Sequence, residues 1–167
     1  INKIINIGNI GENKTILEIG PGYGNLTRKI TYKKPKKILA IEKDKKLVFF
    51  LKNVFKDFDN IKIINDDIFN IIENNNLGQN IIVFGNLPYN ISTQILSSLI
   101  LLEKWPPWYD ILILMFQKEV ANRIIAKKNS EDFGRLSILS NWRLEIKKHF
   151  DVSRNCFFPK PKINSTV

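Results

Sequence analysis

The residues best suited to chemistry by type and spacing are four consecutive ones, Asn86, Leu87, Pro88 and Tyr89. They follow the apolar run 81–85, which is typical of a buried β-strand. A side-chain amide, a rigid proline and an aromatic ring therefore come together at the carboxyl end of an expected strand. Ligands bind at such ends in open α/β sheets, so we expect a binding site here.

This tetrapeptide resembles the Asn/Asp-Pro-Pro-Tyr motif of methyltransferases that act on planar amino groups. An exocyclic amine on an aromatic ring is a poor nucleophile because its lone pair is delocalised into the ring. If the Asn86 side-chain oxygen and the Leu87 carbonyl accept its two N–H bonds, the lone pair is freed toward a methyl donor. Pro88 would hold that carbonyl in place, and Tyr89 would stack on a flipped base. The alternative is an Asx-Pro turn beside a core tyrosine.

A second stretch, Gly20-Pro21-Gly22-Tyr23-Gly24, follows an expected strand and opens an expected helix. Glycines in this position let a ligand approach the backbone closely. The spacing differs from the dinucleotide pattern G-x-G-x-x-G, and no phosphate-binding Lys-Ser/Thr pair follows, so a pyrophosphate ligand is less favoured. The alternative is a tight strand-to-helix turn that binds nothing.

Acidic side chains accompany the ends of the first three expected strands, as Glu18, Glu42 and Asp67. Glu42 comes roughly 20 residues after Gly20, where a carboxylate accepts hydrogen bonds from ribose hydroxyls. Asp67 is placed to accept from an exocyclic amine such as that of adenine. Each acid alone is more simply a solvated residue or a helix cap. Together they predict an adenosine-bearing ligand without phosphate, S-adenosylmethionine.

Strand-like and helix-like segments alternate along the chain. We expect strands over 15–19, 38–42, 61–64, 81–85, 111–116 and 142–150, with a last one at 163–167. We expect helices over 1–10, 26–30, 44–55, 68–73, 92–103, 119–126 and 135–140, and a loop over 74–78. This alternation predicts an α/β, Rossmann-like fold with a mostly parallel sheet and helices on both faces, which by itself leaves the function open.

The composition narrows the class of protein. A chain of 167 residues with 44% hydrophobic content suits one domain, and no apolar run reaches the ~18 to 20 residues of a membrane helix. The single Cys156 excludes an internal disulfide and a Cys-based zinc site, and we expect no metal and a cytoplasmic location. The net charge of +10 favours a polyanionic partner such as nucleic acid, although a Lys-, Asn- and Ile-rich composition is also typical of an AT-rich genome.

Longer stretches are similar, in order and spacing, to the KsgA-type ribosomal RNA adenine dimethyltransferases. They are Phe84-Gly85-Asn86-Leu87-Pro88-Tyr89-Asn90-Ile91-Ser92-Thr93, Gln117-Lys118-Glu119-Val120 with Arg123, Gly134-Arg135-Leu136-Ser137, and Phe157-x-Pro159-x-Pro161-Lys162. Glu18 to Gly22, Ile41-Glu42 and Asp67 match that family's cofactor motifs. The resemblance implies a class I S-adenosylmethionine-dependent methyltransferase fold. It also implies transfer of two methyl groups to N6 of each of two adjacent adenines near the 3′ end of small-subunit rRNA.

The resemblance also implies roles for individual residues. The target adenine would be held by Asn86, Leu87, Pro88 and Tyr89, with Phe157 stacking on its other face. The cofactor would be bound by Glu18, Gly20, Gly22, Glu42, Asp67, the adjacent Ile68, and Asn86. Candidate RNA contacts are Arg28, Lys118, Arg123, Arg135 and Arg143, although helical Lys and Arg are usually just solvated. The implied partner is small-subunit rRNA within an assembling ribosomal particle, with no membrane, and the protein is expected to be a monomer.

Two parts of the family pattern are not found in the sequence. These are an amino-terminal segment with a Phe-Gly-Gln-Asn-Phe-type motif and a carboxyl-terminal helical domain. We therefore expect residues 1–167 to be a catalytic-domain fragment that folds but methylates RNA poorly.

Other functions remain open. The antibiotic-resistance branch of the same superfamily methylates an adenine in large-subunit rRNA and typically has Ile in place of Leu87. A DNA adenine methyltransferase is less favoured because Leu87 replaces the usual first proline. A non-catalytic nucleic-acid-binding factor, like some organellar relatives that act in transcription, is also compatible, although intact Asn86 and Tyr89 argue against loss of catalysis.

Overall fold

The structure is a computed structural model that describes residues 1–74 and 77–167. These residues form two compact units, the first from residues 1–86 and 103–114, the second from residues 87–102 and 115–167. Strand β5 (Tyr109–Gln117) runs from the first unit into the second. The loop predicted for residues 74–78 lies partly outside the described residues.

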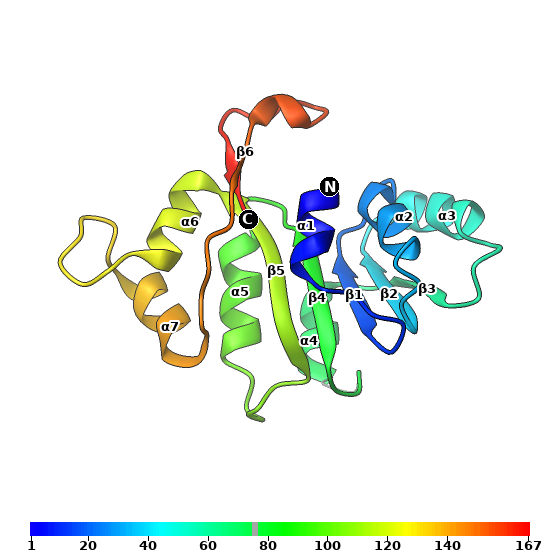
Figure 1. The fold of residues 1–167 in the computed structure, drawn as a ribbon, viewed down its shortest axis with the longest axis horizontal. Coiled ribbons are helices and arrows are strands. Elements are labelled where there is room, and N and C mark those ends of the chain that lie inside the picture. Colours follow the sequence, from blue (N-terminus) through cyan, green and yellow to red (C-terminus); the bar gives the residue numbers. More distant parts are fainter. Residues whose placement is uncertain (75–76) are drawn as a thin grey trace. The chain divides into compact units, whose positions relative to one another are not determined.

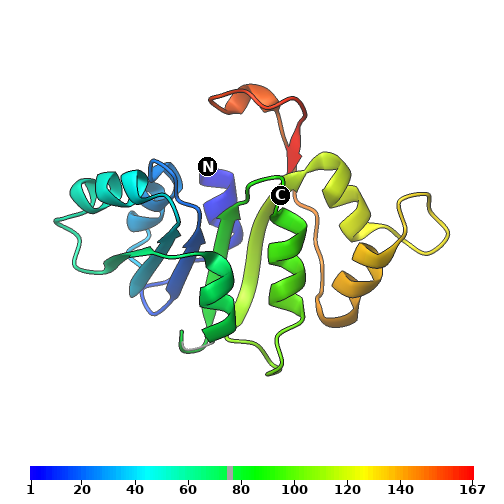
Figure 2. The same cartoon turned by 180° about the vertical axis from the view of Figure 1, so that it is seen from behind.

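The first unit alternates strands with helices. Its helices are α1 (Asn2–Ile7), α2 (Asn25–Thr31), α3 (Lys45–Val54) and α4 (Ile68–Asn74). Its strands are β1 (Thr15–Ile19), β2 (Lys37–Glu42), β3 (Ile61–Asn65), β4 (Ile81–Asn86) and the first part of β5, in the order β3-β2-β1-β4-β5. Strands β1 to β4 pair in parallel. Helix α1 lies on the face of this sheet seen in Figure 1, and α4 lies on the opposite face, seen in Figure 2.

The central strands β1, β2 and β4 are buried on both faces, which explains their nearly continuous apolar sequences. Ile16 and Leu17 of β1 are completely inaccessible to solvent, as are all residues of β4 from Ile81 to Phe84.

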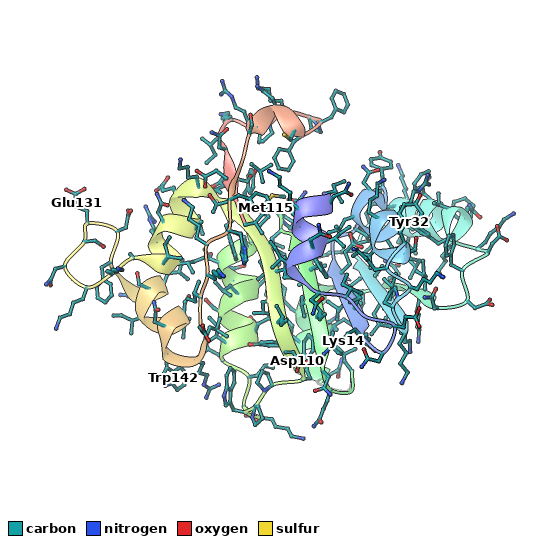
Figure 3. The ribbon with its side chains drawn as sticks, in the orientation of Figure 1. Lys14, Tyr32, Asp110, Met115, Glu131 and Trp142 are labelled. Atoms are coloured by element: carbon teal, nitrogen blue, oxygen red, sulfur yellow. The ribbon has the colours of Figure 1, made fainter. Side chains whose placement is uncertain are left out.

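An ion pair joins the beginnings of two strands. Lys14, just before β1, pairs with Asp110 near the beginning of β5, with 3.4 Å between Nζ and Oδ2 (Figure 3). The parallel sheet and its helices confirm the predicted α/β architecture.

The second unit is mainly helical. It contains α5 (Ser92–Ile100), the end of β5, α6 (Lys118–Ile125) and α7 (Arg135–Arg143), followed by β6 (Asp151–Val152), the 3₁₀-helix η1 (Arg154–Cys156) and β7 (Ser165–Thr166). The end of β5 pairs antiparallel with β7, and β7 pairs antiparallel with β6. Figure 1 shows the segment from β6 to β7, in orange to red, beside the beginning of α6. The strand predicted at the end of the chain is confirmed as β7.

The strand predicted over residues 142–150 is wrong. Helix α7 continues to Arg143, residues 144–150 are neither helix nor strand, and β6 begins only at Asp151. The Arg143 guanidinium donates to the carbonyls of Ile100 and Leu102 at 2.8 and 2.9 Å, which anchors the end of α7 to the end of α5. The alternating residues that follow have no partner strand until the His149 N–H meets the Val167 carbonyl at 2.9 Å. A weak period-two pattern without a neighbouring strand does not make a sheet.

Candidate functional site

Three adjacent strands of the first unit end at the same level. Ile19, the last residue of β1, is paired with Ile41 of β2 and with Gly85 of β4. The residues that follow at the carboxyl edge of the sheet are Gly20, Glu42 and Asn86. The register therefore brings together one predicted site residue from each of three strands.

The turn after β1 has a backbone that favours glycine. Gly20 and Gly22 have φ of +65° and +58°, and an added Cβ at either position would meet no atom within 4 Å. The Glu42 carboxylate accepts hydrogen bonds from the backbone N–H of Gly22 at 3.2 Å and of Asp44 at 2.9 Å. Glu42 thus fixes the glycine turn beside open space, which is the arrangement that admits a ligand close to the backbone.

The third glycine of this turn has a structural role. Gly24 has φ of +75° and precedes α2, and an added Cβ would lie 2.7 Å from Phe55 Cε2 and 3.0 Å from Leu51 Cδ2. We expect Gly24→Ala to lower the free energy of unfolding by about 2 kcal/mol, because it adds overpacking to backbone strain. Gly22→Ala carries the strain alone and is expected to cost about 1 kcal/mol.

Urea denaturation of the two glycine variants measures this difference. The two substitutions add the same methyl group to two left-handed positions two residues apart, so Gly22→Ala is the matched control. Equal unfolding free energies for the two variants would show that the contact of α2 with Phe55 and Leu51 tolerates a Cβ.

Glu18 lies inside β1, one residue before the strand ends, and is 2% exposed. Its carboxylate accepts a hydrogen bond from Thr27 Oγ1 of α2 at 2.6 Å. Burial raises the pKa of Glu18 to about 7, against the opposing effect of the Thr27 hydrogen bonds. Glu18 therefore ties β1 to α2 across the glycine turn, and a direct contact with a cofactor stays a prediction.

Asp67 follows β3 and begins the turn into α4. Its carboxylate accepts hydrogen bonds from Lys43 Nζ at 2.7 Å and from the Phe69 N–H at 3.1 Å. The hydrogen bond from Lys43 is the main reason that the pKa of Asp67 lies below its usual value. Asp67 is thus an ionised acceptor, and the adjacent Ile68 is buried. Their predicted contacts with an adenine ring stay a prediction.

Asn86 ends β4 with an exposed side chain, whereas Gly85 before it is buried. The exposure of the amide fits a group that acts on a ligand, because a buried side-chain amide would need partners inside the protein.

Leu87, Pro88 and Tyr89 open the second unit. Leu87 is buried, Pro88 is exposed, and the Pro88 carbonyl accepts from the Ile91 N–H at 3.2 Å in the turn that leads to α5. The Tyr89 hydroxyl forms a hydrogen bond of 2.9 Å with Ser165 Oγ of β7. Ser165 is fully buried, so this bond fixes the orientation of the half-buried Tyr89 ring.

Phe157 follows η1 in the same unit and is half-buried. Its neighbour Phe158 is fully exposed. In the part of the chain that the structure describes, Phe157 and Tyr89 form no ring contact with each other. The predicted sandwich of a base between these two rings stays a prediction.

The predicted RNA-contacting residues are spread over several elements. Lys118 Nζ pairs with Asp151 at 2.8 Å, and Arg123 pairs with Glu119 one turn earlier on α6. Arg143 binds the carbonyls at the end of α5 and stacks on Trp142, with 4.0 Å between Cζ and the ring centre, which gives it a structural role. Arg135 is exposed at the beginning of α7, and Arg28 is exposed on α2 of the first unit.

Sequence reasoning missed the partners that position the predicted residues. These are Thr27 for Glu18, Lys43 for Asp67 and Ser165 for Tyr89. It also missed Arg154, whose guanidinium donates to the Lys162 carbonyl at 2.9 Å. No sequence signal marks this last contact, because its acceptor is a backbone carbonyl, which every residue type carries.

Neither a cluster of metal ligands nor a membrane-spanning helix is found in the described residues. Among residues 1–74 and 77–167, no three His, Cys, Asp or Glu side chains are grouped as metal ligands. None of the helices in these two ranges has the length and apolar character that crossing a membrane requires.

Comparison with known proteins gives a family for the whole chain. The family described as ribosomal RNA adenine dimethylase matches residues 1–167. Ribosomal RNA small subunit methyltransferase A of Pelagibacter ubique (strain HTCC1062) is 53% identical over 167 residues, which cover 100% of this chain and 63% of that protein. The chain thus spans less than two thirds of the length of this relative.

Solved structures agree with this match. A dimethyladenosine transferase from Plasmodium falciparum is 29% identical, with a TM-score of 0.84 over 99% of this chain and 58% of the other. The 23S rRNA methyltransferase ErmE is 25% identical, with a TM-score of 0.77 over 98% of this chain and 63% of the other. These likenesses confirm the predicted class I methyltransferase fold. The chain belongs to the ribosomal RNA adenine dimethylase family.

Proposed function

We propose that residues 1–167, with both units together, are the catalytic domain of an S-adenosylmethionine-dependent enzyme that methylates N6 of two adjacent adenines near the 3′ end of small-subunit rRNA. The observation that carries this proposal is the strand register that gathers Gly20, Glu42 and Asn86 at one edge of the sheet. A glycine turn with open space, a carboxylate and an exposed amide at one level suit a methyl donor and an amine acceptor. Family membership narrows the acceptor to ribosomal adenine.

The residues present fit S-adenosylmethionine. The open space at Gly20 and Gly22 is what a Cβ would fill, so these glycines leave room for a ligand against the backbone. Each carboxylate oxygen of Glu42 accepts one backbone N–H and keeps a lone pair for a ribose hydroxyl. Asp67 follows β3, the strand next to β2, and its ionised carboxylate accepts hydrogen bonds. The cofactor would supply an electrophilic methyl group on a sulfonium.

The acceptor residues act on the adenine amine. The Asn86 oxygen and the Leu87 carbonyl accept the two N–H bonds, which directs the nitrogen lone pair out of conjugation with the ring. The Tyr89 ring, oriented by Ser165, stacks on the extruded base, and such a stack is worth about 1–3 kcal/mol. Phe157 covers the other face of the base. Once the methyl group is transferred, the amine nitrogen loses a proton to solvent.

The chain carries the charge that rRNA requires. Its net charge of +10 attracts a phosphate backbone, and the exposed Arg135 and Lys118 belong to the same unit as Tyr89. The RNA would be bound within an assembling small-subunit particle by a monomer in the cytoplasm.

Methyl transfer to ribosomal particles tests this function. We expect the full-length protein to transfer radiolabelled methyl groups from S-adenosylmethionine to small-subunit particles that lack the modification. Digestion and sequencing should place the label at two adjacent adenines near the 3′ end of the RNA. Particles already methylated there are the control and should accept no label. Label found only in large-subunit RNA would contradict the proposal and favour the large-subunit enzyme instead.

A further inference from the structure

The second unit has a pocket that the proposed methyl transfer does not use. Its volume is about 590 Å³, within the range of about 300–1,000 Å³ of small-molecule sites. Helix α6 and the segment from η1 to β7 form it, through Lys118, Glu119, Asn122, Arg154, Lys162, Ile163 and Asn164. Figures 1 and 2 both show this segment next to the beginning of α6.

Hydrogen bonds hold the walls of the pocket in place. The Asn164 carbonyl accepts from the Lys118 N–H at 3.0 Å, and Asn164 Oδ1 accepts from the Arg154 N–H at 3.0 Å. Arg154 Nη1 donates to the Lys162 carbonyl at 2.9 Å and so closes the loop between η1 and β7. Asn164 and Arg154 therefore fix the segment that carries Lys162 against α6.

The charge balance of the pocket is positive. Lys118 is paired with Asp151, and Glu119 is paired with Arg123 on the next turn of α6. Within the described residues, the side chains of Arg154 and Lys162 have no acidic partner. The pocket thus presents two uncompensated cations, a guanidinium and an ammonium, to any ligand that enters. Both groups are typical ligands of phosphate.

The pocket lies next to the residue that orients Tyr89. Asn164 precedes Ser165, whose hydroxyl meets the Tyr89 hydroxyl at 2.9 Å. Lys118 follows Gln117, which is paired with Ser165 across β5 and β7. Two residues that line the pocket, Asn164 and Lys118, are thus the chain neighbours of the β7–β5 pair to which Tyr89 is bound.

We propose that the pocket binds the backbone phosphodiester next to the target adenine, through Lys162 and Arg154. This inference rests on the proposed function, because it takes the target base to lie on Tyr89. A phosphate held there would fix the strand while the base stays extruded. Phosphate contacts set register and orientation on a nucleic acid, whereas base contacts choose the sequence.

The test compares two lysines of the same loop in the full-length protein. Lys162→Ala removes a pocket cation whose ammonium group forms no hydrogen bond or ion pair within the described residues. Lys160→Ala removes an exposed lysine two residues earlier that does not line the pocket. Fluorescence anisotropy measures binding of a single-stranded RNA oligonucleotide carrying the two adenines, at several salt concentrations. We expect Lys162→Ala to weaken binding about 3- to 10-fold and to reduce the salt slope by about one, whereas Lys160→Ala leaves both near the wild-type values.

A second arm identifies the phosphate. The second RNA carries a neutral methylphosphonate at the linkage next to the target adenine. Wild-type protein should bind this RNA about 3- to 10-fold more weakly than it binds the unmodified RNA. The Lys162→Ala variant should bind the two RNAs equally well. Equal affinity of wild-type protein for the two oligonucleotides would overturn the inference. Binding of inorganic phosphate to wild-type protein but not to Lys162→Ala, with unchanged RNA affinity, would assign the pocket to a free anion and also overturn it.

The same measurements separate this inference from the proposed function. If wild-type protein methylates the particles and the two lysine variants bind RNA equally well, only the pocket assignment fails. If wild-type protein methylates no small-subunit RNA, the proposed function fails, and with it the assumption that the target base lies on Tyr89.

Discussion

Replacing Asn86 with alanine is expected to lower the rate of methyl transfer by about 100- to 1,000-fold, the effect of removing one oriented hydrogen-bonding group from a reacting centre. The side chain is exposed at the end of β4, at the level of Gly20 and Glu42. If Asn86 holds the amine as proposed, loss of its oxygen would remove the acceptor of one N–H bond and leave the nitrogen lone pair in conjugation with the ring. Single-turnover transfer of labelled methyl to saturating RNA measures this rate.

Two further variants make the Asn86 experiment specific. Asn90→Ala removes an exposed amide four residues later and is expected to keep the wild-type rate. Asn86→Asp keeps an acceptor oxygen and is expected to retain most activity, because Asp also occurs in the motif that this stretch resembles. RNA affinity should change little in all three variants. A wild-type rate for Asn86→Ala would show that the amide does not polarise the amine.

Replacing Glu18 with glutamine is expected to change how stability depends on pH. Burial raises the pKa of Glu18 from 4.5 to about 7 in the folded protein. Between these values the unfolded chain releases the proton and the folded protein retains it, so the free energy of unfolding falls as the pH rises through this window. The loss approaches about 3 kcal/mol above pH 7. Glutamine has the same shape, accepts from Thr27 and does not ionise, so the variant avoids this loss.

Denaturant unfolding of wild-type protein and Glu18→Gln at several pH values tests this expectation. The difference in unfolding free energy should grow in favour of the variant by about 3 kcal/mol between pH 4.5 and pH 8. Glu12→Gln, a change at an exposed acid of the first unit, is the control and should show no such trend. If the difference in unfolding free energy between the two proteins is constant over this pH range, ionisation of Glu18 does not destabilise the folded protein and the expectation is wrong.

Much of the fold follows from local patterns in the sequence. The predicted strands at 15–19 and 61–64 match β1 and β3 within one residue, because apolar runs bounded by turn residues are local signals. The ends of helices were less well predicted: α5 ends at Ile100 although residues up to 103 fit the pattern. The strand predicted over 142–150 is wrong because a strand needs a neighbouring strand to pair with. Helix α7 extends to Arg143, and the first paired strand after it, β6, begins at Asp151.

The candidate site was predictable in its residue types but not in its arrangement. The strand pattern places Gly20, Glu42 and Asn86 after three strands, and the parallel register confirms that they share one edge. Glu18 precedes this edge by two residues of the chain. The structure shows its carboxylate buried against Thr27 of α2, a partner that the strand pattern does not indicate.

By itself, the sequence determined the alternation of strands and helices, the glycine turn and the Asn-Leu-Pro-Tyr stretch, because these depend on neighbouring residues. Only the tertiary structure decided that the Tyr89 hydroxyl meets Ser165, 76 residues later, and that Lys118 shares a pocket with Lys162. These contacts depend on the pairing of β7 with the end of β5, a long-range event that no local pattern specifies. The same pairing orients the ring proposed to hold the adenine and builds the pocket proposed to hold the phosphate beside it.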